Sequence, residues 1–270
     1  MTSNRQTGKV ALITGAARGQ GRAHAVRLAA EGADIIALDI CATAESTAYP
    51  GPTEADLAET VRLVEAQDRR IVARTADIRD FDALTAVVEE GVAALGRLDV
   101  VVANAGICSA SMSWEISVDQ WRETIDTNLT GTFFTMKATV PVLLEQGTGG
   151  SIIITSSVAG LRGLPFLGHY AASKHGVVGL AKSMANELGQ HNIRVNTVHP
   201  HGVATGMTVP DMMALTQQYA TTLGPIFMGA LPDQVSQPED IADAVAWLAS
   251  DEARHVTGIQ LPVDLGTLLR

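Results

Sequence analysis

Tyr170 and Lys174 are the residues of this chain best suited to proton chemistry, because they are four positions apart at the start of a helical pattern. Side chains at that spacing share one face of a helix. An ammonium group beside a phenol favours the phenolate, so we expect the pKa of Tyr170 to fall from its ordinary value of about 10 toward neutrality. The chain has only three tyrosines, so chance rarely produces this spacing. The pair predicts a general acid or base.

Ser157 and Asn128 are the polar residues of interest that precede this pair. Ser157 follows the apolar run 151–155, which predicts a strand, and the carboxyl ends of such strands form the ligand crevice of an open α/β sheet. Its hydroxyl is a candidate to bind a substrate oxygen, and the neighbouring Ser156 competes for that role. Asn128 lies within a long predicted helix, where Asn is a poor helix former, and this indicates a bound water or a backbone kink.

A glycine-rich turn at 14–21 (TGAARGQG) follows the first predicted strand and opens a helix. Its glycines let backbone N–H groups approach a pyrophosphate, and the start of the helix adds its positive dipole end. The alternative is a simple tight connection between strand and helix. The position of the turn in the first β-α unit favours dinucleotide binding.

Asp39 ends the second predicted strand, 18 residues after Gly21. A carboxylate at that place accepts hydrogen bonds from an adenosine ribose and repels a 2′-phosphate, so it predicts NAD rather than NADP. Arg18 argues for NADP, since a basic residue in the turn can meet that phosphate. Asp39 has the greater weight because its position addresses the 2′-oxygen directly.

Short β-branched runs alternate with longer helical patterns along the whole chain. Strands are predicted at 9–14, 34–40, 71–75, 98–103, 151–155, 193–198 and 258–263, and helices at 20–31, 53–68, 80–95, 118–145, 170–190 and 242–250. The strands are nearly continuous apolar runs, typical of a parallel sheet covered on both faces. We expect one α/β domain over residues 1–270, a doubly wound (Rossmann) fold with about seven strands.

Composition excludes several other classes of protein. Hydrophobic residues make up 46% of the chain, enough for a large core, while a net charge of −10 does not suit a nucleic acid or an anionic membrane surface. Cys41 and Cys108 form no disulfide framework or zinc motif, and the seven histidines show no metal spacing, so we expect no metal. Without a signal peptide or a run of about 20 apolar residues, we expect a cytoplasmic protein.

Together these motifs resemble the short-chain dehydrogenase/reductase family over essentially the whole chain. The resemblance implies a catalytic tetrad of Asn128, Ser157, Tyr170 and Lys174. It implies NAD contacts in the glycine turn, after the second and third strands, in an Asn-Ala-Gly motif and in a proline-glycine segment: Gly15, Ala17, Arg18, Gly19, Gln20, Gly21, Asp39, Ile40, Asp77, Ile78, Asn104, Ala105, Gly106, Tyr170, Lys174, Pro200, Gly202, Val203 and Thr205. The chain departs from the family at His201, which separates Pro200 from Gly202. His201 and His169 are candidates to line the site.

In the reaction that the resemblance implies, Tyr170 takes the proton of an alcohol while hydride passes to NAD. Lys174 lowers the pKa of Tyr170 and binds the nicotinamide ribose. Ser157 holds the substrate oxygen, and Asn128 positions a water. Members of the family commonly form homotetramers, here through the helix that carries Tyr170 and the helix at 118–145.

A loop at 41–52 and the sequence Asn-Thr-Val-His-Pro at 196–200 resemble the mycofactocin-linked branch of the family, whose members are similar to carveol dehydrogenases. This resemblance implies tightly held NAD that is recycled in place by an external redox partner, mycofactocin. The loop either folds over the adenosine or is an ordinary surface insertion, and both interpretations stay open.

The segment 206–238 is predicted to be a substrate lid, because it is long and rich in Met, Thr and Pro. Its apolar residues and Trp114 would close over a hydrophobic secondary alcohol or ketone, such as the terpenoid carveol: Met207, Met212, Met213, Leu215, Tyr219, Leu223, Ile226, Phe227 and Met228. The alternative is a helix pair that packs on the domain or on another subunit.

Two other functions stay open on the sequence alone. A non-catalytic NAD-binding redox sensor has no use for a Tyr–Lys pair, and a turnover assay distinguishes it. An NADPH-dependent keto reductase is opposed by Asp39, and the relative affinities for NADH and NADPH distinguish it.

Overall fold

A parallel sheet forms the centre of the computed structural model, which describes residues 4–207 and 209–270. Its strands are β1 (Val10–Thr14), β2 (Asp34–Asp39), β3 (Ile71–Thr75), β4 (Val100–Ala103), β5 (Gly150–Thr155), β6 (Ile193–Pro200) and β7 (Gln260–Val263). They lie in the order β3-β2-β1-β4-β5-β6-β7, with every neighbouring pair parallel. The predicted doubly wound fold with seven strands is confirmed.

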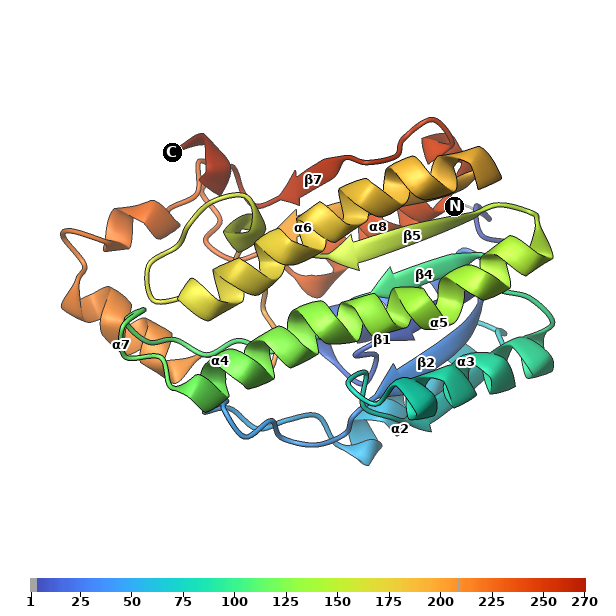
Figure 1. Cartoon of the computed structure of the whole chain (residues 1–270), viewed down its shortest axis with the longest axis horizontal. Helices are drawn as coiled ribbons and strands as arrows, with labels where there is room; N and C mark the ends of the chain where they lie inside the picture. Colours follow the sequence, from blue (N-terminus) through green and yellow to red (C-terminus); the bar gives the residue numbers. More distant parts are fainter. Residues whose placement is uncertain (1–3, 208) are drawn as a thin grey trace.

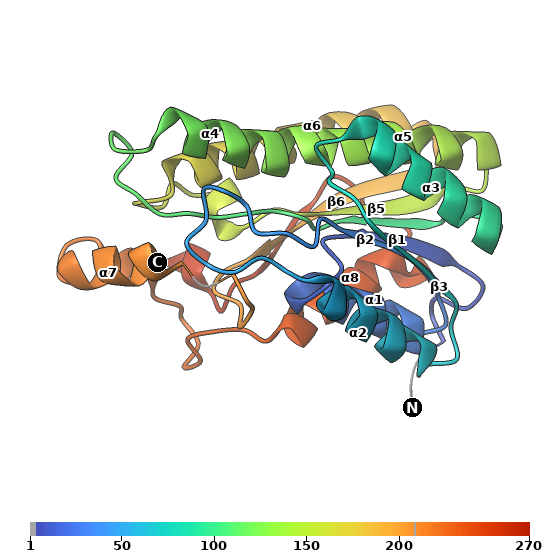
Figure 2. The same ribbon diagram turned by 90° about the horizontal axis from the view of Figure 1, so that it is seen from below.

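Helices cover both faces of this sheet. They are α1 (Gly19–Ala30), α2 (Glu54–Glu65), α3 (Phe81–Leu95), α4 (Val118–Ile125), α5 (Gly131–Gln146), α6 (Gly168–Leu188), α7 (Pro210–Gln218) and α8 (Pro238–Ala249). Figure 2 shows α3, α4, α5 and α6 on one face, α1, α2 and α8 on the other, and α7 beyond the end of the sheet. No helix in the described parts of the chain is both long and apolar enough to cross a bilayer.

The central strands have no exposed face, and this explains their unbroken apolar runs. In β1, Leu12 packs in the apolar cluster beneath α3, α5 and α6, while Ile13 packs in the cluster beneath α1 and α8. Both side chains are fully buried. Burial of one such side chain contributes about 1.5–3 kcal/mol, so the two layers hold the sheet rigid beneath the loops at its ends.

The largest local departure from the predicted elements is in the helix expected at 118–145. A π-helical turn at Asp126–Thr130 separates α4 from α5, and Asn128 lies in it. Such turns widen a helix locally and occur often at functional sites. The backbone irregularity expected at Asn128 is therefore present.

Other boundaries differ by a few residues. Helix α8 begins at Pro238, four residues before the predicted start, because proline suits the first helical turn and Gln237 and Asp240 form a capping box. Strand β6 continues to Pro200, where its pairing with β7 also ends. Helix α7, inside the segment 206–238, was not predicted.

The strand order reverses between β1 and β4, and this reversal locates the site. Loops that follow strands on the two sides of such a point diverge and leave a crevice at the carboxyl ends of the strands. Figure 1 shows α7 at this same end of the sheet, together with the connection between β2 and α2. The motifs recognised in the sequence follow β1, β2, β4, β5 and β6, so the topology brings them together.

Candidate active site

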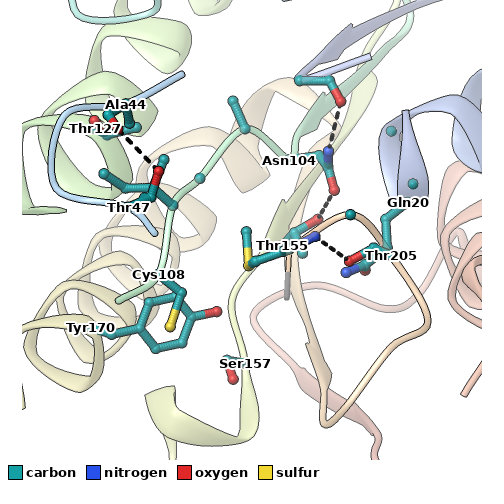
Figure 3. Close-up of a pocket in the computed structure, with 18 of the residues that line it drawn as sticks. Gln20, Ala44, Thr47, Asn104, Cys108, Thr127, Thr155, Ser157, Tyr170 and Thr205 are labelled. Carbon is teal, nitrogen blue, oxygen red and sulfur yellow. Dashed lines mark hydrogen bonds between the residues drawn. The ribbon is translucent and has the colours of Figure 1, made fainter. Parts of the chain in front are cut away.

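A cavity of about 390 Å³ opens at the carboxyl ends of the strands. Of the residues predicted to form the site, all line this cavity except Ala17 and Asn128. Figure 3 shows Gln20, Asn104 and Thr205 at one end of it, and Tyr170, Ser157 and Cys108 at the other. The fold therefore gathers residues that are up to 190 positions apart, from Gly15 to Thr205, around one space.

The glycine turn is shaped by close backbone contacts. A Cβ atom at Gly21 would collide with the carbonyl oxygen of Gly15, and one at Gly15 would lie 2.8 Å from the Cα atom of Ala105. Gly15 also has a φ of +67°, a conformation that side chains other than glycine adopt with strain. The Asn104 amide donates a hydrogen bond of 3.1 Å to the Thr14 carbonyl oxygen, which ties the turn to the segment after β4.

Asp39 is held by the backbone around it. Asp39 as a whole is 5% exposed, and its carboxylate accepts hydrogen bonds from the N–H groups of Ala17, at 2.9 Å, and Cys41, at 3.1 Å. Burial raises the pKa of Asp39, and these bonds oppose the shift. Ala17 thus contacts Asp39 instead of the cavity.

The Arg18 guanidinium does not point only toward the place beside Asp39 where a 2′-phosphate would lie. Its guanidinium donates a hydrogen bond of 2.5 Å to the carbonyl oxygen of Pro50 and packs so close to Gly206 that a Cβ atom there would lie 2.8 Å from Cζ. Arg18 therefore joins the loop at 41–52 to the beginning of the segment 206–238.

The loop at 41–52 lies along the cavity and not on a remote surface. The Tyr49 hydroxyl is buried and accepts a hydrogen bond of 3.1 Å from the N–H group of Cys108. On the other side, Glu123 of α4 accepts hydrogen bonds from the N–H groups of Glu45, at 3.1 Å, and Ser46, at 2.7 Å. Figure 3 shows Ala44 and Thr47 of the loop beside Thr127 on the cavity wall.

Tyr49 and Cys108 are site residues that the sequence reasoning missed. Both line the cavity, and burial raises the pKa of Tyr49 to about 12 and that of the Cys108 thiol to about 12. The signal that could have found Tyr49 is the scarcity of tyrosine: a large aromatic residue in a polar loop is a candidate anchor. Cys108 has no comparable signal except its place directly after the Asn-Ala-Gly motif.

Lys174 is almost fully buried at the end of the cavity that holds Tyr170 and Ser157. Its ammonium group donates a hydrogen bond of 2.8 Å to the carbonyl oxygen of Thr155 and lies 5.6 Å from the centre of the Tyr170 ring. Burial lowers the pKa of Lys174 to about 8.

Tyr170 differs from the expectation drawn from its spacing to Lys174. Burial raises the pKa of Tyr170, and a hydrogen bond with Ser157 opposes the shift. The prediction that Lys174 brings this pKa toward neutrality is wrong for this structure, because the loss of water around a phenolate outweighs the stabilisation that its neighbours give.

Ser156 and Ser157, which the sequence left as competitors, have separate roles. The Ser156 hydroxyl donates a hydrogen bond of 3.1 Å to the carbonyl oxygen of Lys174 and so holds α6 to the end of β5. The Ser157 hydroxyl lies 3.4 Å from the carbonyl oxygen of Pro200 and accepts a bond of 3.1 Å from the Ala159 N–H group. Ser157 lies on the cavity wall beside Tyr170 (Figure 3).

Asn128 lies behind the cavity wall and is fully buried. Its amide oxygen accepts a hydrogen bond of 2.8 Å from the Ile107 N–H group, and its amide nitrogen donates to the Ile107 carbonyl oxygen at 2.9 Å and to the Ser173 hydroxyl at 3.2 Å. A Cβ atom at Gly106 would lie 3.1 Å from the Asn128 amide oxygen and 3.5 Å from the Lys174 ammonium. Asn128 therefore fixes the segment after β4 against α6, next to Lys174.

The segment after β6 is anchored at its base. The Ala204 N–H group donates to the Ser236 carbonyl oxygen, and the Ser236 N–H group donates to the Gly202 carbonyl oxygen, both at 2.9 Å. The His201 ring donates a hydrogen bond of 2.9 Å to the Phe227 carbonyl oxygen. The insertion of His201 after Pro200 thus provides a contact to the segment 206–238, and Gly202, Val203 and Thr205 stay on the cavity wall.

The segment 206–238 has one side toward the cavity and one toward solvent; its residue Thr208 lies outside the described part of the chain. Met207, Met212 and Phe227 line the cavity. Other apolar side chains pack on the cluster that includes Phe166 and Leu167: Leu215, Tyr219, Leu223 and Ile226.

Some residues assigned to the lid or the site point elsewhere. Trp114 is 80% exposed, Met213 is 73% exposed and Met228 is 47% exposed. The prediction that Trp114 and Met213 cover the substrate is therefore wrong. His169 is also wrong as a lining residue, because its ring is buried against the Ser109 hydroxyl at 2.8 Å, whereas His201 does line the cavity. Among the described residues, no cluster of side chains has the form of a metal site.

Comparison with known proteins agrees with this geometry. The model of the short chain dehydrogenase family matches residues 9–214. Over 276 residues the chain is 45% identical to (−)-trans-carveol dehydrogenase of Rhodococcus erythropolis, covering 98% of this chain and 99% of that protein.

Two solved structures share the fold closely. One is a short chain dehydrogenase from Mycobacterium paratuberculosis bound to NAD, with a TM-score of 0.95 and 54% identity over 98% of this chain and 100% of that chain. The other is a carveol dehydrogenase from Mycobacterium avium in complex with NAD, with a TM-score of 0.94 and 52% identity over 98% of this chain and 99% of that chain.

Proposed function

The chain belongs to the short-chain dehydrogenase/reductase family, and from that premise we propose that it is an NAD-dependent oxidoreductase that interconverts a hydrophobic secondary alcohol and its ketone. The observation that carries the proposal is a single cavity with Asp39 and the glycine turn at one end and Ser157, Tyr170 and Lys174 at the other. Such a cavity sets a dinucleotide beside a proton donor.

The residues of the cavity fit NAD. Gly15 and Gly21 allow close backbone packing that a Cβ atom would prevent, and the side-chain oxygen of Gln20 has no hydrogen-bond partner among the described residues. The glycine turn would hold the pyrophosphate, and Asp39 the adenosine ribose. The other end would be held by Lys174 at the nicotinamide ribose and by the segment 202–205 at the carboxamide. Bound NAD supplies the acceptor or donor of hydride.

The residues of the chain itself hold the substrate oxygen and move its proton. Ser157 and Tyr170 present two hydroxyls to one place, where a carbonyl or alcohol oxygen can accept or donate hydrogen bonds (Figure 3). Because burial favours the neutral phenol, Tyr170 carries the proton that a ketone oxygen would take up. In the opposite direction, the positive charge of Lys174 helps the phenol to lose that proton.

Asn128 acts in this proposal through the groups around it. It holds Ile107 and Ser173 in place, so the segment after β4 and helix α6 keep Lys174 at a fixed distance from Tyr170. A water beside Asn128 would link Lys174 to solvent and carry the proton away.

The substrate class follows from the side chains around Tyr170. Cys108, Leu164, Leu167, Met212 and Phe227 form an apolar surface at this end of the cavity. A cyclic, mostly hydrocarbon alcohol fits such a surface better than a small hydroxy acid, which would leave a carboxylate without a partner. Two of the relatives are named carveol dehydrogenases, and carveol is an alcohol of this kind. Carveol is therefore the substrate we propose to test first.

The loop at 41–52 supports slow exchange of NAD. It contacts α4 through Glu123, the substrate end through Tyr49 and the lid segment through Arg18, so it would have to detach at several places before a dinucleotide could leave. An external redox partner such as mycofactocin would then recycle the cofactor in place. Exposed apolar side chains on α4 and α5, namely Trp121, Phe133 and Leu144, support a homotetramer formed through these helices together with α6, which carries Tyr170.

The proposal is tested with the Tyr170→Phe variant, trans-carveol and both cofactors. We expect kcat to fall by about 10³-fold or more, because the proton carrier is lost, while NAD binds with unchanged affinity. Turnover near the normal rate in this variant would reject the assignment of Tyr170. A wild-type protein that binds NAD and oxidises no alcohol would be a redox sensor, and one that prefers NADPH would be a keto reductase.

A further inference from the structure

We propose that His199 is a positioning residue for this reaction: its imidazole holds the backbone of Ser157 and thereby sets the direction of the serine hydroxyl. The inference rests on the proposed function, because Ser157 is there the residue that binds the substrate oxygen. His199 does not line the cavity and therefore acts only through Ser157.

The geometry around His199 leaves one arrangement of its protons. The ring is fully buried, with Nδ1 2.7 Å from the Ser157 carbonyl oxygen and Nε2 2.7 Å from the Thr197 hydroxyl. A carbonyl oxygen only accepts hydrogen bonds, so Nδ1 carries the proton and donates it to Ser157. Burial lowers the pKa of His199 to about 4, so the ring is neutral and accepts at Nε2. The Thr197 hydroxyl donates to it at 2.7 Å, closer than the Ile259 carbonyl oxygen at 3.4 Å. Thr197 fixes the ring, and the ring fixes Ser157.

The bond from His199 to Ser157 lies just beyond the end of the backbone ladder between β5 and β6. The last backbone bond between β5 and β6 at this edge runs from the Ser156 N–H group to the Val198 carbonyl oxygen, at 2.9 Å. Two residues later β6 reaches Pro200, which has no N–H group and cannot continue the ladder. Ser157 lies one residue beyond this ladder, and its carbonyl oxygen accepts the N–H group of the His199 imidazole.

The serine hydroxyl depends on this bond through the backbone. Ser157 is extended, with φ −170° and ψ 165°, and directly precedes the short 3₁₀ turn at Val158–Gly160. Its hydroxyl accepts the Ala159 N–H bond that begins this turn. A rotation of the peptide group after Ser157 would move the carbonyl away from His199 and would also disturb the start of the 3₁₀ turn, whose Ala159 N–H bond holds the serine hydroxyl.

Two variants of nearly equal size separate the two ring nitrogens. In His199→Asn the amide nitrogen occupies the place of Nδ1, so it can still donate to Ser157. In His199→Gln the amide nitrogen occupies the place of Nε2, so it keeps the contact to Thr197 and loses that to Ser157. The paired measurements are kcat and KM with trans-carveol, the Kd of NAD, and hydrogen exchange at the Ala159 N–H group.

We expect His199→Asn to keep at least about a third of the wild-type kcat and His199→Gln to lose about tenfold or more, with the Kd of NAD within about twofold in both. Exchange at Ala159 should be about tenfold faster in the Gln variant only. In a Ser157→Ala background the difference in kcat between the two variants should fall below about twofold, because both act through a hydroxyl that is gone.

Equal kcat and equal exchange in the two variants would overturn the role of His199, as would an undiminished difference in the Ser157→Ala background. A wild-type protein that turns over neither trans-carveol nor related cyclic alcohols would instead reject the proposed function. In that event hydrogen exchange at Ala159 still decides whether His199 holds Ser157.

Discussion

The two ends of the cavity are built in different ways. At the cofactor end, the shape comes from backbone atoms and buried polar bonds: Gly21 packs on the Gly15 carbonyl, and Asp39 accepts two N–H groups. At the substrate end, the shape comes from apolar side chains of the segment 206–238. Backbone hydrogen bonds between Ser236 and residues 202 and 204 join the end of that segment to the chain that follows β6. A bond from His201 to Phe227 joins its middle to the same part of the chain.

The difference between the two ends indicates where the protein tolerates substitutions. A backbone turn that must contact a pyrophosphate has few alternative sequences, because a single added methyl group collides with another backbone atom. An apolar wall can be made from many combinations of Met, Leu and Phe with a similar volume. We therefore expect substitutions at the cofactor end to abolish binding and those at the substrate end to change preference.

The largest effect is expected for Gly21→Ala. The added Cβ atom meets the Gly15 carbonyl oxygen, so the turn must open and its N–H groups move away from the pyrophosphate. We expect the Kd of NAD to rise about 100-fold or more, measured by calorimetry on the folded variant. The control is Gly179→Ala on α6, where nothing lies within 4 Å of the added atom and NAD binding should be unchanged. Equal affinity for NAD in the two variants would mean that close backbone packing at Gly21 does not shape the cofactor end.

A smaller effect is expected for Asp39→Asn, which removes the charge and keeps the size. Without that charge a 2′-phosphate is no longer repelled, so we expect the preference for NAD over NADP to fall about 10- to 100-fold in kcat/KM. The control Glu54→Gln, at the exposed start of α2, removes the same charge away from the cavity. If the preference for NAD over NADP falls equally in both variants, the net charge of the protein, and not the position of Asp39, determines that preference.

Much of the cofactor end could be predicted from the sequence, because backbone requirements leave visible signs. The glycine turn needs glycine, and the carboxylate stands at the end of a strand, so spacing alone located Gly15, Gly21 and Asp39. Tyr170 and Lys174 were found in the same way, by the period of a helix. The pKa of Tyr170 was not, because it depends on how much water the folded chain removes from the phenol.

The substrate end was harder to predict, and the reason is physical. An apolar residue in a loop packs inward or outward according to contacts that no spacing reveals. Met212 and Met213 are neighbours in the sequence, yet one lines the cavity and the other is 73% exposed. Tyr49 and His199 were missed because each acts on a residue far along the chain, through a hydrogen bond that only the fold creates.

Phe227→Ala tests whether the apolar wall chooses the substrate. Phe227 lines the cavity and stacks on Phe166, with ring centres 6.3 Å apart. Removal of the ring should raise KM for trans-carveol about tenfold, while the Kd of NAD stays the same. Met213→Ala is the matched control on the solvent side of the same segment and should change neither value. An equal rise in KM in both variants would mean that the segment acts by its general stability and not by contact with the substrate.

The last prediction concerns the response to acid of a buried histidine at the cofactor end. His24 of α1 is fully buried behind the glycine turn, and neither ring nitrogen has a partner among the described residues. Burial lowers the pKa of His24 to about 3, so the folded protein leaves it neutral while the unfolded chain binds a proton below about pH 6.5.

A pKa lowered on folding means that this stability is complete above pH 6.5 and is lost as the pH falls toward 3. The loss is about 1.4 kcal/mol for each pH unit in that window. Urea unfolding between pH 6.5 and 5 should therefore show a shallower dependence on pH in His24→Leu than in the wild type. His255→Leu, at an exposed position, should keep the wild-type slope. If His24→Leu also keeps the wild-type slope, the buried imidazole is not the group that makes the stability of the folded protein sensitive to acid.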